Sequence, residues 1–172
     1  MDQFQRTSVM ICALEILRKE ELQNGNKWIG INRFSIGLFV GGGISPNLFQ
    51  DRNGNGSNDK LSQLFNEKKP RENNPFPISS CPSCGTYLLP KEQRLKAEDG
   101  SVDNSFYGFA GMGNNFRTYC PEESCQFYLS LPVHFVDEDV RDQLPSFVLG
   151  TIDKFAMLTW NRSNPKLMGA DT

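Results

Sequence analysis

Apolar residues in the first part of this chain recur at the spacing of one helix face. The repeat predicts an amphipathic helix from about Gln3 to Leu22, with an inner face made of Met10, Ala13, Leu14 and Leu17. Asp2, followed three residues later by Gln5, has the form of a capping box at the start of this helix. The run Asn-Gly-Asn at 24–26 is turn-forming and is expected to end it.

Two further segments have the pattern of strands in a parallel sheet. Residues 34–40 are nearly all apolar or small, as expected of a strand buried on both faces, and they run into three glycines at 41–43. Residues 145–150 form a second apolar strand, followed by a turn and a helix through Met157, Leu158 and Trp160. This order predicts an α/β domain in which loops at the carboxyl ends of the strands carry function.

The stretch after the glycines is more polar and contains further helix signals. Ser45-Pro46-Asn47 places a capping residue before a proline and predicts the start of a short helix. Residues 51–58 are turn-forming and are expected to be a surface loop. A second helix is predicted from Asp59 to Lys69, with an inner side made of Leu61, Leu64 and Phe65.

Four of the five cysteines form two short pairs, Cys81 with Cys84 and Cys120 with Cys125. Two such pairs provide the four thiolates of a tetrahedral metal site, for which zinc is the first candidate, and Gly85 supplies a permissive backbone beside the sulfurs. The second pair is spaced C-x4-C, and residues 85–119 separate the pairs by more than a compact ribbon usually has. The sequence therefore predicts a structural zinc site that does no chemistry itself.

Two disulfides are the alternative to a metal site. They would require an oxidising compartment, and the chain opens with no charged segment followed by an apolar one, while Cys12 remains an odd thiol. A redox C-x-x-C would normally begin a helix, whereas Cys81 follows a proline-rich loop at 74–77.

Composition sets the limits for the rest of the chain. With 172 residues, of which 38% are hydrophobic and 22% charged, one soluble domain or one domain with a small insertion is expected. A net charge of −2 gives no global basic field, so any contact with nucleic acid has to be local. No apolar run approaches the roughly 20 residues of a membrane-spanning helix, and we expect a cytoplasmic protein with no membrane partner.

The acidic run at 137–139 follows the apolar segment 133–136 and superficially resembles a magnesium-binding Walker B motif. Metal-phosphate chemistry also needs a phosphate loop, and Gly41-Gly42-Gly43 lacks the lysine of that motif. The acidic residues are therefore better explained as the first turn of a short helix through Val140 and Leu144. His134, the single histidine, is expected to be a packed side chain, or else a substitute fourth zinc ligand.

Several of these segments, in this order, resemble the large superfamily 2 helicase of bacterial DISARM anti-phage systems and its relatives. The resemblance covers nearly the whole chain and is carried by the two cysteine pairs and by residues 2–15, 34–42, 45–47, 132–139 and 149–156. It implies a fragment of the first RecA-like domain, with RecA-like parts at 1–69 and 132–172 and an inserted zinc-ribbon-like β module at 70–131. The resemblance also implies that the phosphate-binding loop of the ATP site lies upstream of this chain. It implies that the acidic DExH-type box of that site lies downstream of Thr172.

The resemblance also implies which residues contact nucleic acid. Gly41 and Gly42 match a motif whose backbone approaches a phosphodiester, and Thr151 and Lys154 match a segment that contacts the backbone of the tracked DNA or RNA strand. Taken alone, Thr151 is better explained by a helix cap and Lys154 by a solvated charge. ATP and magnesium would act only in the complete parent protein, so this chain by itself is expected not to hydrolyse ATP.

Other features of the chain leave a second class of function open. Aromatic residues surround the cysteine pairs and could stack on bases, although an apolar layer beside the metal explains them better: Tyr107, Phe109, Phe116, Tyr119, Phe127 and Tyr128. The basic residues that flank the module are interspersed with acids and fit solvated charges: Lys68, Lys69, Arg71, Lys91, Arg94 and Lys96. The alternative function is a non-enzymatic zinc-ribbon module that binds nucleic acid or a protein partner, such as another subunit of a defence system.

Overall fold

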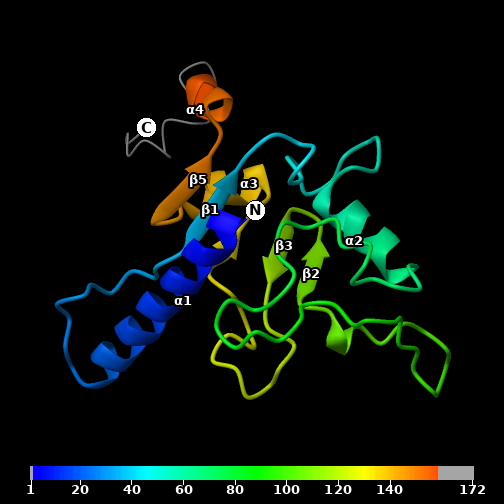
Figure 1. The fold of residues 1–172 in the computed structure, drawn as a ribbon, viewed down its shortest axis with the longest axis horizontal. Helices are drawn as coiled ribbons and strands as arrows, with labels where there is room; N and C mark the ends of the chain where they lie inside the picture. Colours follow the sequence, from blue (N-terminus) through cyan, green and yellow to red (C-terminus); the bar gives the residue numbers. More distant parts are fainter. Residues whose placement is uncertain (1, 159–172) are drawn as a thin grey trace.

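A three-stranded parallel sheet forms the centre of one half of the molecule. The computed structural model describes residues 2–158, and Figure 1 shows their arrangement. The strands are β1 (Ile36–Phe39), β4 (Val133–His134) and β5 (Phe147–Gly150), in the spatial order β4-β1-β5. Ile36 pairs with Val133 on one side and with Phe147 on the other. All four residues of β1 are buried, as the apolar run predicted for a central strand.

Helices and a second, smaller sheet complete the fold. The helices are α1 (Asp2–Gln23), α2 (Ser57–Phe65), the 3-10 helix η1 (Asn104–Phe106), α3 (Asp137–Gln143) and α4 (Ile152–Leu158). The antiparallel hairpin β2 (Phe109–Met112) and β3 (Asn115–Thr118) lies beside α2 (Figure 1). The mixed α/β class with a parallel sheet is thus confirmed. None of the helices in residues 2–158 is long and apolar enough to cross a membrane.

An aromatic cluster joins the hairpin to the parallel sheet. Phe76 lies before the first cysteine pair, Phe109 and Phe116 lie on the two strands of the hairpin, and Phe135 follows β4. Their ring centroids are 4.6–6.2 Å apart, and all four side chains are buried. These contacts belong to one continuous hydrophobic core that also includes residues of α1 and α2.

The predicted inner face of α1 is wrong, although the helix itself is confirmed. Met10, Ala13 and Leu17 are exposed and Leu14 is half-buried. The buried face is made instead of Phe4, Ser8, Ile11, Cys12, Glu15 and Arg18. Three of these residues are polar, and their burial is possible because each finds a partner: the Ser8 hydroxyl donates to the Phe4 carbonyl, and Arg18 pairs with Glu15. Asp2 of the predicted capping box has no described side chain.

The short helix predicted from Ser45 is absent, and residues 41–45 form a turn. The backbone there has another use, because the carbonyls of Pro46 and Asn47 accept hydrogen bonds from the first amides of α3, those of Asp137 and Glu138. The second predicted helix is shorter than expected: it starts at Ser57, inside the predicted surface loop, and ends at Phe65. Its inner side is as predicted, with Leu61 and Leu64 buried.

The remaining predictions about elements are confirmed where the structure describes them. The acidic residues at 137–139 form the first turn of α3, which includes Val140 and ends at Gln143 with Leu144 as its C-terminal cap. The last strand and helix are β5 and α4, which includes Met157, whereas Trp160 lies outside the described residues.

Candidate metal centre and strand-end loops

Two tight turns bring the four paired cysteines together. In the first turn, the Cys81 amide donates to the Thr86 carbonyl at 2.7 Å and the Gly85 amide donates to the Cys81 carbonyl at 2.9 Å. Gly85 has a φ of +79°, a left-handed conformation that suits glycine, as predicted. In the second turn, the Cys120 amide donates to the Phe127 carbonyl and the Cys125 amide to the Glu122 carbonyl, both at 3.0 Å.

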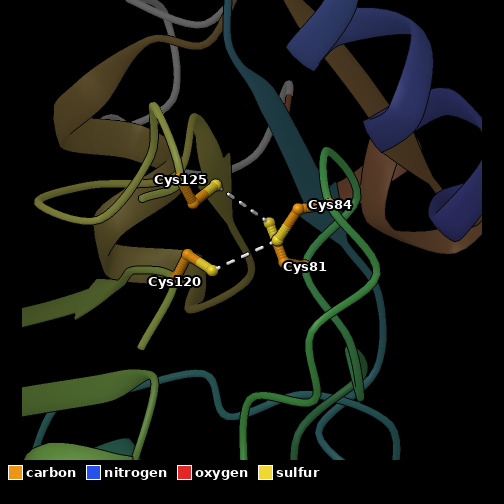
Figure 2. Close-up of side chains that lie close together, drawn as sticks. All are labelled: Cys81, Cys84, Cys120 and Cys125. Atoms are coloured by element: carbon orange, nitrogen blue, oxygen red, sulfur yellow. Dashed lines mark hydrogen bonds between the residues drawn. The ribbon is translucent and has the colours of Figure 1, made fainter. Parts of the chain in front are cut away.

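The four sulfurs have the spacing of a tetrahedral metal site. Figure 2 shows the side chains pointing toward one another from the two turns. The Sγ atoms of Cys84 and Cys120 are 3.5 Å apart, those of Cys81 and Cys125 are 3.9 Å apart, and all four lie within 4.8 Å of one another. A zinc ion with Zn–S bonds of about 2.3 Å places its ligand sulfurs about 3.8 Å apart. The four cysteines could therefore hold a metal ion.

The disulfide alternative does not fit this geometry. All five cysteines are free thiols, and the 3.5 Å between the Sγ atoms of Cys84 and Cys120 is far above a disulfide bond length of about 2.05 Å. His134 is also not part of the cluster. Its Nδ1 lies 2.7 Å from a carboxylate oxygen of Asp139, and it is the packed side chain that its apolar flanks indicated.

Burial disfavours thiolates in this cluster when no cation is present. Burial raises the pKa of Cys81 to about 11 and that of Cys120 still further. At Cys84 burial also acts to raise the pKa, but hydrogen bonds with Thr86 and the neighbouring cysteines outweigh it and lower the pKa to about 7. A divalent cation would supply the positive charge that keeps all four sulfurs ionised.

Cys12 lies beside this cluster, a contact that the sequence did not indicate. It is 1% exposed on the buried face of α1. Burial raises its pKa to about 12, and the nearby Cys81 and Cys125 act in the same direction. The Gln5 side chain of the same helix donates to the Ser80 carbonyl at 3.5 Å, next to the first cysteine turn. α1 therefore packs directly against the candidate metal centre.

The four residues predicted to contact nucleic acid lie at one edge of the parallel sheet. Gly41 and Gly42 follow β1, and Thr151 follows β5. Because β1 and β5 are adjacent and parallel, their carboxyl ends meet, and the Thr151 amide donates to the Phe39 carbonyl at 3.2 Å. Thr151 also occupies the cap position of α4, since its carbonyl accepts from the Phe155 amide at 3.2 Å.

Lys154 is not a solvated charge. Its Nζ forms an ion pair with the Oδ2 atom of Asp137, which is fully buried at the start of α3, and donates to the Asn47 Oδ1 atom at 3.2 Å. The side chain of Lys154 is 17% exposed, and its ammonium lies 5.0 Å from the centroid of the Phe39 ring. Lys154 thus connects α4 to α3 and to the loop after the glycines.

Asp137 is the residue of this edge that sequence reasoning missed. Burial raises its pKa above the ordinary value, although Lys154 and Arg141 act in the opposite direction. Arg141 lies 3.7 Å away, one helical turn later. Within the described residues the second oxygen of Asp137, Oδ1, has no hydrogen-bond partner. The acidic run indicated a helix start, but nothing local to it indicated a lysine partner 17 residues later.

Comparison with known proteins shows a distant similarity to a DISARM protein. The chain is similar to the DISARM protein DrmA of Bacillus paralicheniformis (strain ATCC 9945a / NCIMB 11709 / CD-2), with 29% identity over 161 residues. The match covers 93% of this chain but 13% of the length of that protein. No family model matches the chain. The similarity supports a relation to a DISARM protein.

Proposed function

We propose that this chain is part of an ATP-dependent nucleic-acid helicase or translocase of superfamily 2 that acts in anti-phage defence. In this proposal residues 1–69 and 132–172 belong to its first RecA-like domain. Residues 70–131 form an inserted module held by structural zinc. The chain supplies loops that contact a DNA or RNA strand, while the ATP site lies elsewhere in the complete protein. Similarity to a DISARM protein over 93% of the chain supports the defence role and suggests defence-system partner subunits.

One structural observation carries the strand-contacting part of the proposal. Gly41, Gly42, Thr151 and Lys154 gather at the carboxyl ends of two adjacent parallel strands, which is where α/β sheets usually bind their ligands. Gly41 and Gly42 are exposed and leave backbone amides accessible, and Thr151 adds an exposed hydroxyl. The ammonium group of Lys154 has three protons. Asp137 and Asn47 accept hydrogen bonds from two of them, so one proton remains for a phosphate oxygen.

The glycines allow a test that separates strand binding from folding. A Cβ atom added at Gly41 would meet no atom within 4 Å, and the same is true at Gly43. Gly41→Ala is therefore expected to fold normally but to weaken binding of a labelled single-stranded oligonucleotide about fivefold or more, because its methyl group would keep a phosphate from the backbone. Gly43→Ala is the matched control, with unchanged affinity expected. Equal affinities of wild type and both variants in fluorescence anisotropy would contradict the proposed contact.

A separate prediction concerns Glu138, which stands where a Walker B glutamate would. Its Oε2 atom accepts a hydrogen bond from the Phe49 amide at 2.6 Å, so the carboxylate stabilises the loop after β1. Glu138→Gln is expected to lower the free energy of unfolding by about 1 kcal/mol and to leave ATP hydrolysis by the complete protein essentially intact. Loss of ATP hydrolysis in a normally folded Glu138→Gln protein would instead mean that Glu138 belongs to the acidic box of the ATP site.

The second candidate function is a non-enzymatic zinc module that binds nucleic acid or a protein. The four clustered cysteines are compatible with it, since such a module needs only a metal and an exposed face. ATP hydrolysis by the complete protein separates the two candidates. Hydrolysis that is stimulated by single-stranded nucleic acid and reduced by Gly41→Ala would support the helicase, whereas a complete protein without hydrolysis would favour the binding module.

A further inference from the structure

A groove beside the candidate metal centre has a local excess of positive charge. It has a volume of about 550 Å3 and lies between α1 and the turn that carries Cys125. Three basic residues line it, Arg18, Lys19 and Arg33, against one acidic residue, Glu15. The chain as a whole carries a net charge of −2, so this concentration of positive charge is local. We call it the α1–turn groove.

Two of the three cations form no ion pair in the described residues, although the Glu15 carboxylate also attracts Arg33 at longer range. Arg18 is neutralised by Glu15, to which it donates two hydrogen bonds of 2.7 Å. Arg33 donates instead to the carbonyl and hydroxyl of Ser130, at 2.9 and 3.2 Å. Lys19 lies 5.0 Å from the centroid of the Phe127 ring. Among residues 2–158, neither Lys19 nor Arg33 forms an ion pair, so both charges remain available to an anion.

The same groove exposes side chains on which a flat ring can pack. Tyr128 is 38% exposed and Leu129 is 77% exposed, and both line the groove beside the cations. Among the other aromatic residues around the cysteines, Tyr107, Phe109, Phe116 and Phe127 are buried, Tyr119 is half-buried, and Tyr87 is exposed outside the groove. Tyr128 therefore departs from the predicted apolar layer. Its exposure has no packing role in the core, whereas an aromatic ring next to free cations is the usual platform for an unpaired base.

We propose that the α1–turn groove binds single-stranded nucleic acid, with Lys19 and Arg33 contacting phosphates and Tyr128 stacking on a base. The inference deepens the proposed function, on which it rests, by giving the strand a second contact surface away from the carboxyl ends of β1 and β5. Alternating phosphate and base chemistry matches the groove better than an acidic peptide would, because carboxylates alone leave Tyr128 and Leu129 uncovered. The volume lies within the range of about 300–1,000 Å3 that is typical of ligand sites.

The test measures binding of a fluorescein-labelled oligothymidylate of about 20 nucleotides by anisotropy between about 50 and 200 mM salt. Arg33→Gln keeps a donor for Ser130 but loses the charge, and Lys19→Gln loses the charge on α1. Each is expected to weaken binding about tenfold and to reduce the salt slope by about 0.7. Tyr128→Leu is expected to weaken binding about fivefold or more with no change in slope.

Lys69→Gln is the matched control, since it makes the same charge change at a lysine that pairs with Glu72 outside the groove. A second measurement gives the rate at which a chelator removes zinc from each variant. It is needed because the only role of Lys19 and Arg33 could be to neutralise the negative charge of the cysteine thiolates. The proposal is overturned if the groove variants release zinc sooner but bind the oligonucleotide as Lys69→Gln does. It is also overturned if labelled polyglutamate binds as tightly as the oligonucleotide, or if the wild-type chain binds no oligonucleotide.

Gly41→Ala makes the two proposals separable. Loss of binding in Gly41→Ala with wild-type affinity in all three groove variants would leave the strand-end contacts standing and remove the groove. Loss of binding in the groove variants with wild-type affinity in Gly41→Ala would leave the groove standing and remove the strand-end contacts. If one strand crosses both surfaces, we expect lower affinity in Gly41→Ala and in the groove variants. The changes in binding free energy should then be additive.

Discussion

Replacement of Cys120 by serine is expected to abolish metal binding and to unfold the region around the two cysteine turns. Wild-type chain should contain about one zinc per molecule, and the variant should contain almost none, because a structural site needs all four thiolates. Cys120 is fully buried, and its sulfur lies 3.5 Å from that of Cys84 across the cluster. Removing its sulfur therefore leaves three thiols, which no longer complete a tetrahedral ligand set.

The size of this effect follows from what metal binding contributes. Apparent binding free energies of structural zinc are about 10–16 kcal/mol in small peptides, comparable with the total stability of an ordinary domain, about 5–15 kcal/mol. The segment that contains the cysteines has one two-stranded hairpin and isolated bridges as regular sheet structure, so the metal is expected to supplement the packing of its buried side chains against the core. Elemental analysis gives the metal content, and near-ultraviolet circular dichroism reports the loss of packing around Tyr107 and Phe127.

Cys12→Ala is the matched control for this experiment. Cys12 is as buried as Cys81 and Cys120 and lies beside the cluster, but it is not one of the four clustered sulfurs. This variant should keep about one zinc per chain and lose about 1 kcal/mol of stability at most, through the lost packing of one sulfur atom. Equal metal loss in Cys12→Ala and Cys120→Ser would mean that the assignment of ligands is wrong. A wild-type chain with no metal would remove the centre altogether.

The cysteine cluster was the part of the molecule most accessible to sequence reasoning. A ligand pair such as Cys81 and Cys84 is set by a local turn, and the chemistry of four thiolates restricts what they can do once they meet. The same holds for β1, whose unbroken apolar run from Ile36 to Phe39 indicates burial on both faces without knowledge of its neighbours. Both predictions used information contained within a few residues.

Features that depend on distant partners were not accessible in this way. The buried face of α1 includes Glu15 and Arg18, which the pattern assigned to the surface, because polar residues normally lie there. Their burial is possible only because the two side chains pair and the Phe34 amide donates to Glu15 at 3.1 Å. The predicted helix at Ser45 failed for a similar reason, since the following carbonyls are used to cap α3, more than 85 residues later in the chain.

The second large effect is expected for Lys154, and it tests the same kind of long-range contact. Lys154→Met removes the ammonium that faces the buried carboxylate of Asp137 and leaves Arg141, 3.7 Å away, as the remaining cation. Removing one partner of a buried ion pair typically costs about 3–5 kcal/mol, because the other charge stays buried. Urea denaturation should therefore show a loss of about 3 kcal/mol, near the lower limit since Arg141 compensates in part.

The double variant Asp137→Asn/Lys154→Met separates two contributions to stability. One is the cost of leaving a buried carboxylate unpaired, and the other is the net contribution of the ion pair. Asparagine cannot be ionised, so the double variant is expected to recover most of the stability that Lys154→Met loses. Lys60→Met is a suitable control, because Lys60 belongs to α2 and forms no ion pair in the described part of the chain. It should change the free energy of unfolding by less than about 0.5 kcal/mol.

The pH dependence of Lys154→Met gives the sharpest test of this contact. Burial already raises the pKa of Asp137 above its ordinary value of 3.8 in the wild-type fold, and loss of the lysine removes a group that lowers it. The folded variant therefore binds a proton at Asp137 over a pH range in which the unfolded chain has released it. Stability is then greatest below the unfolded pKa and falls as pH rises through the folded one. The deficit of Lys154→Met relative to wild type should shrink on acidification, because the pKa of Asp137 is raised further in the variant than in the wild type. The stability of the double variant should lack any contribution of this group to its pH dependence, since it has no carboxyl at this position. A deficit that is independent of pH would mean that Lys154 contributes through packing on Phe39 rather than through the charge of Asp137.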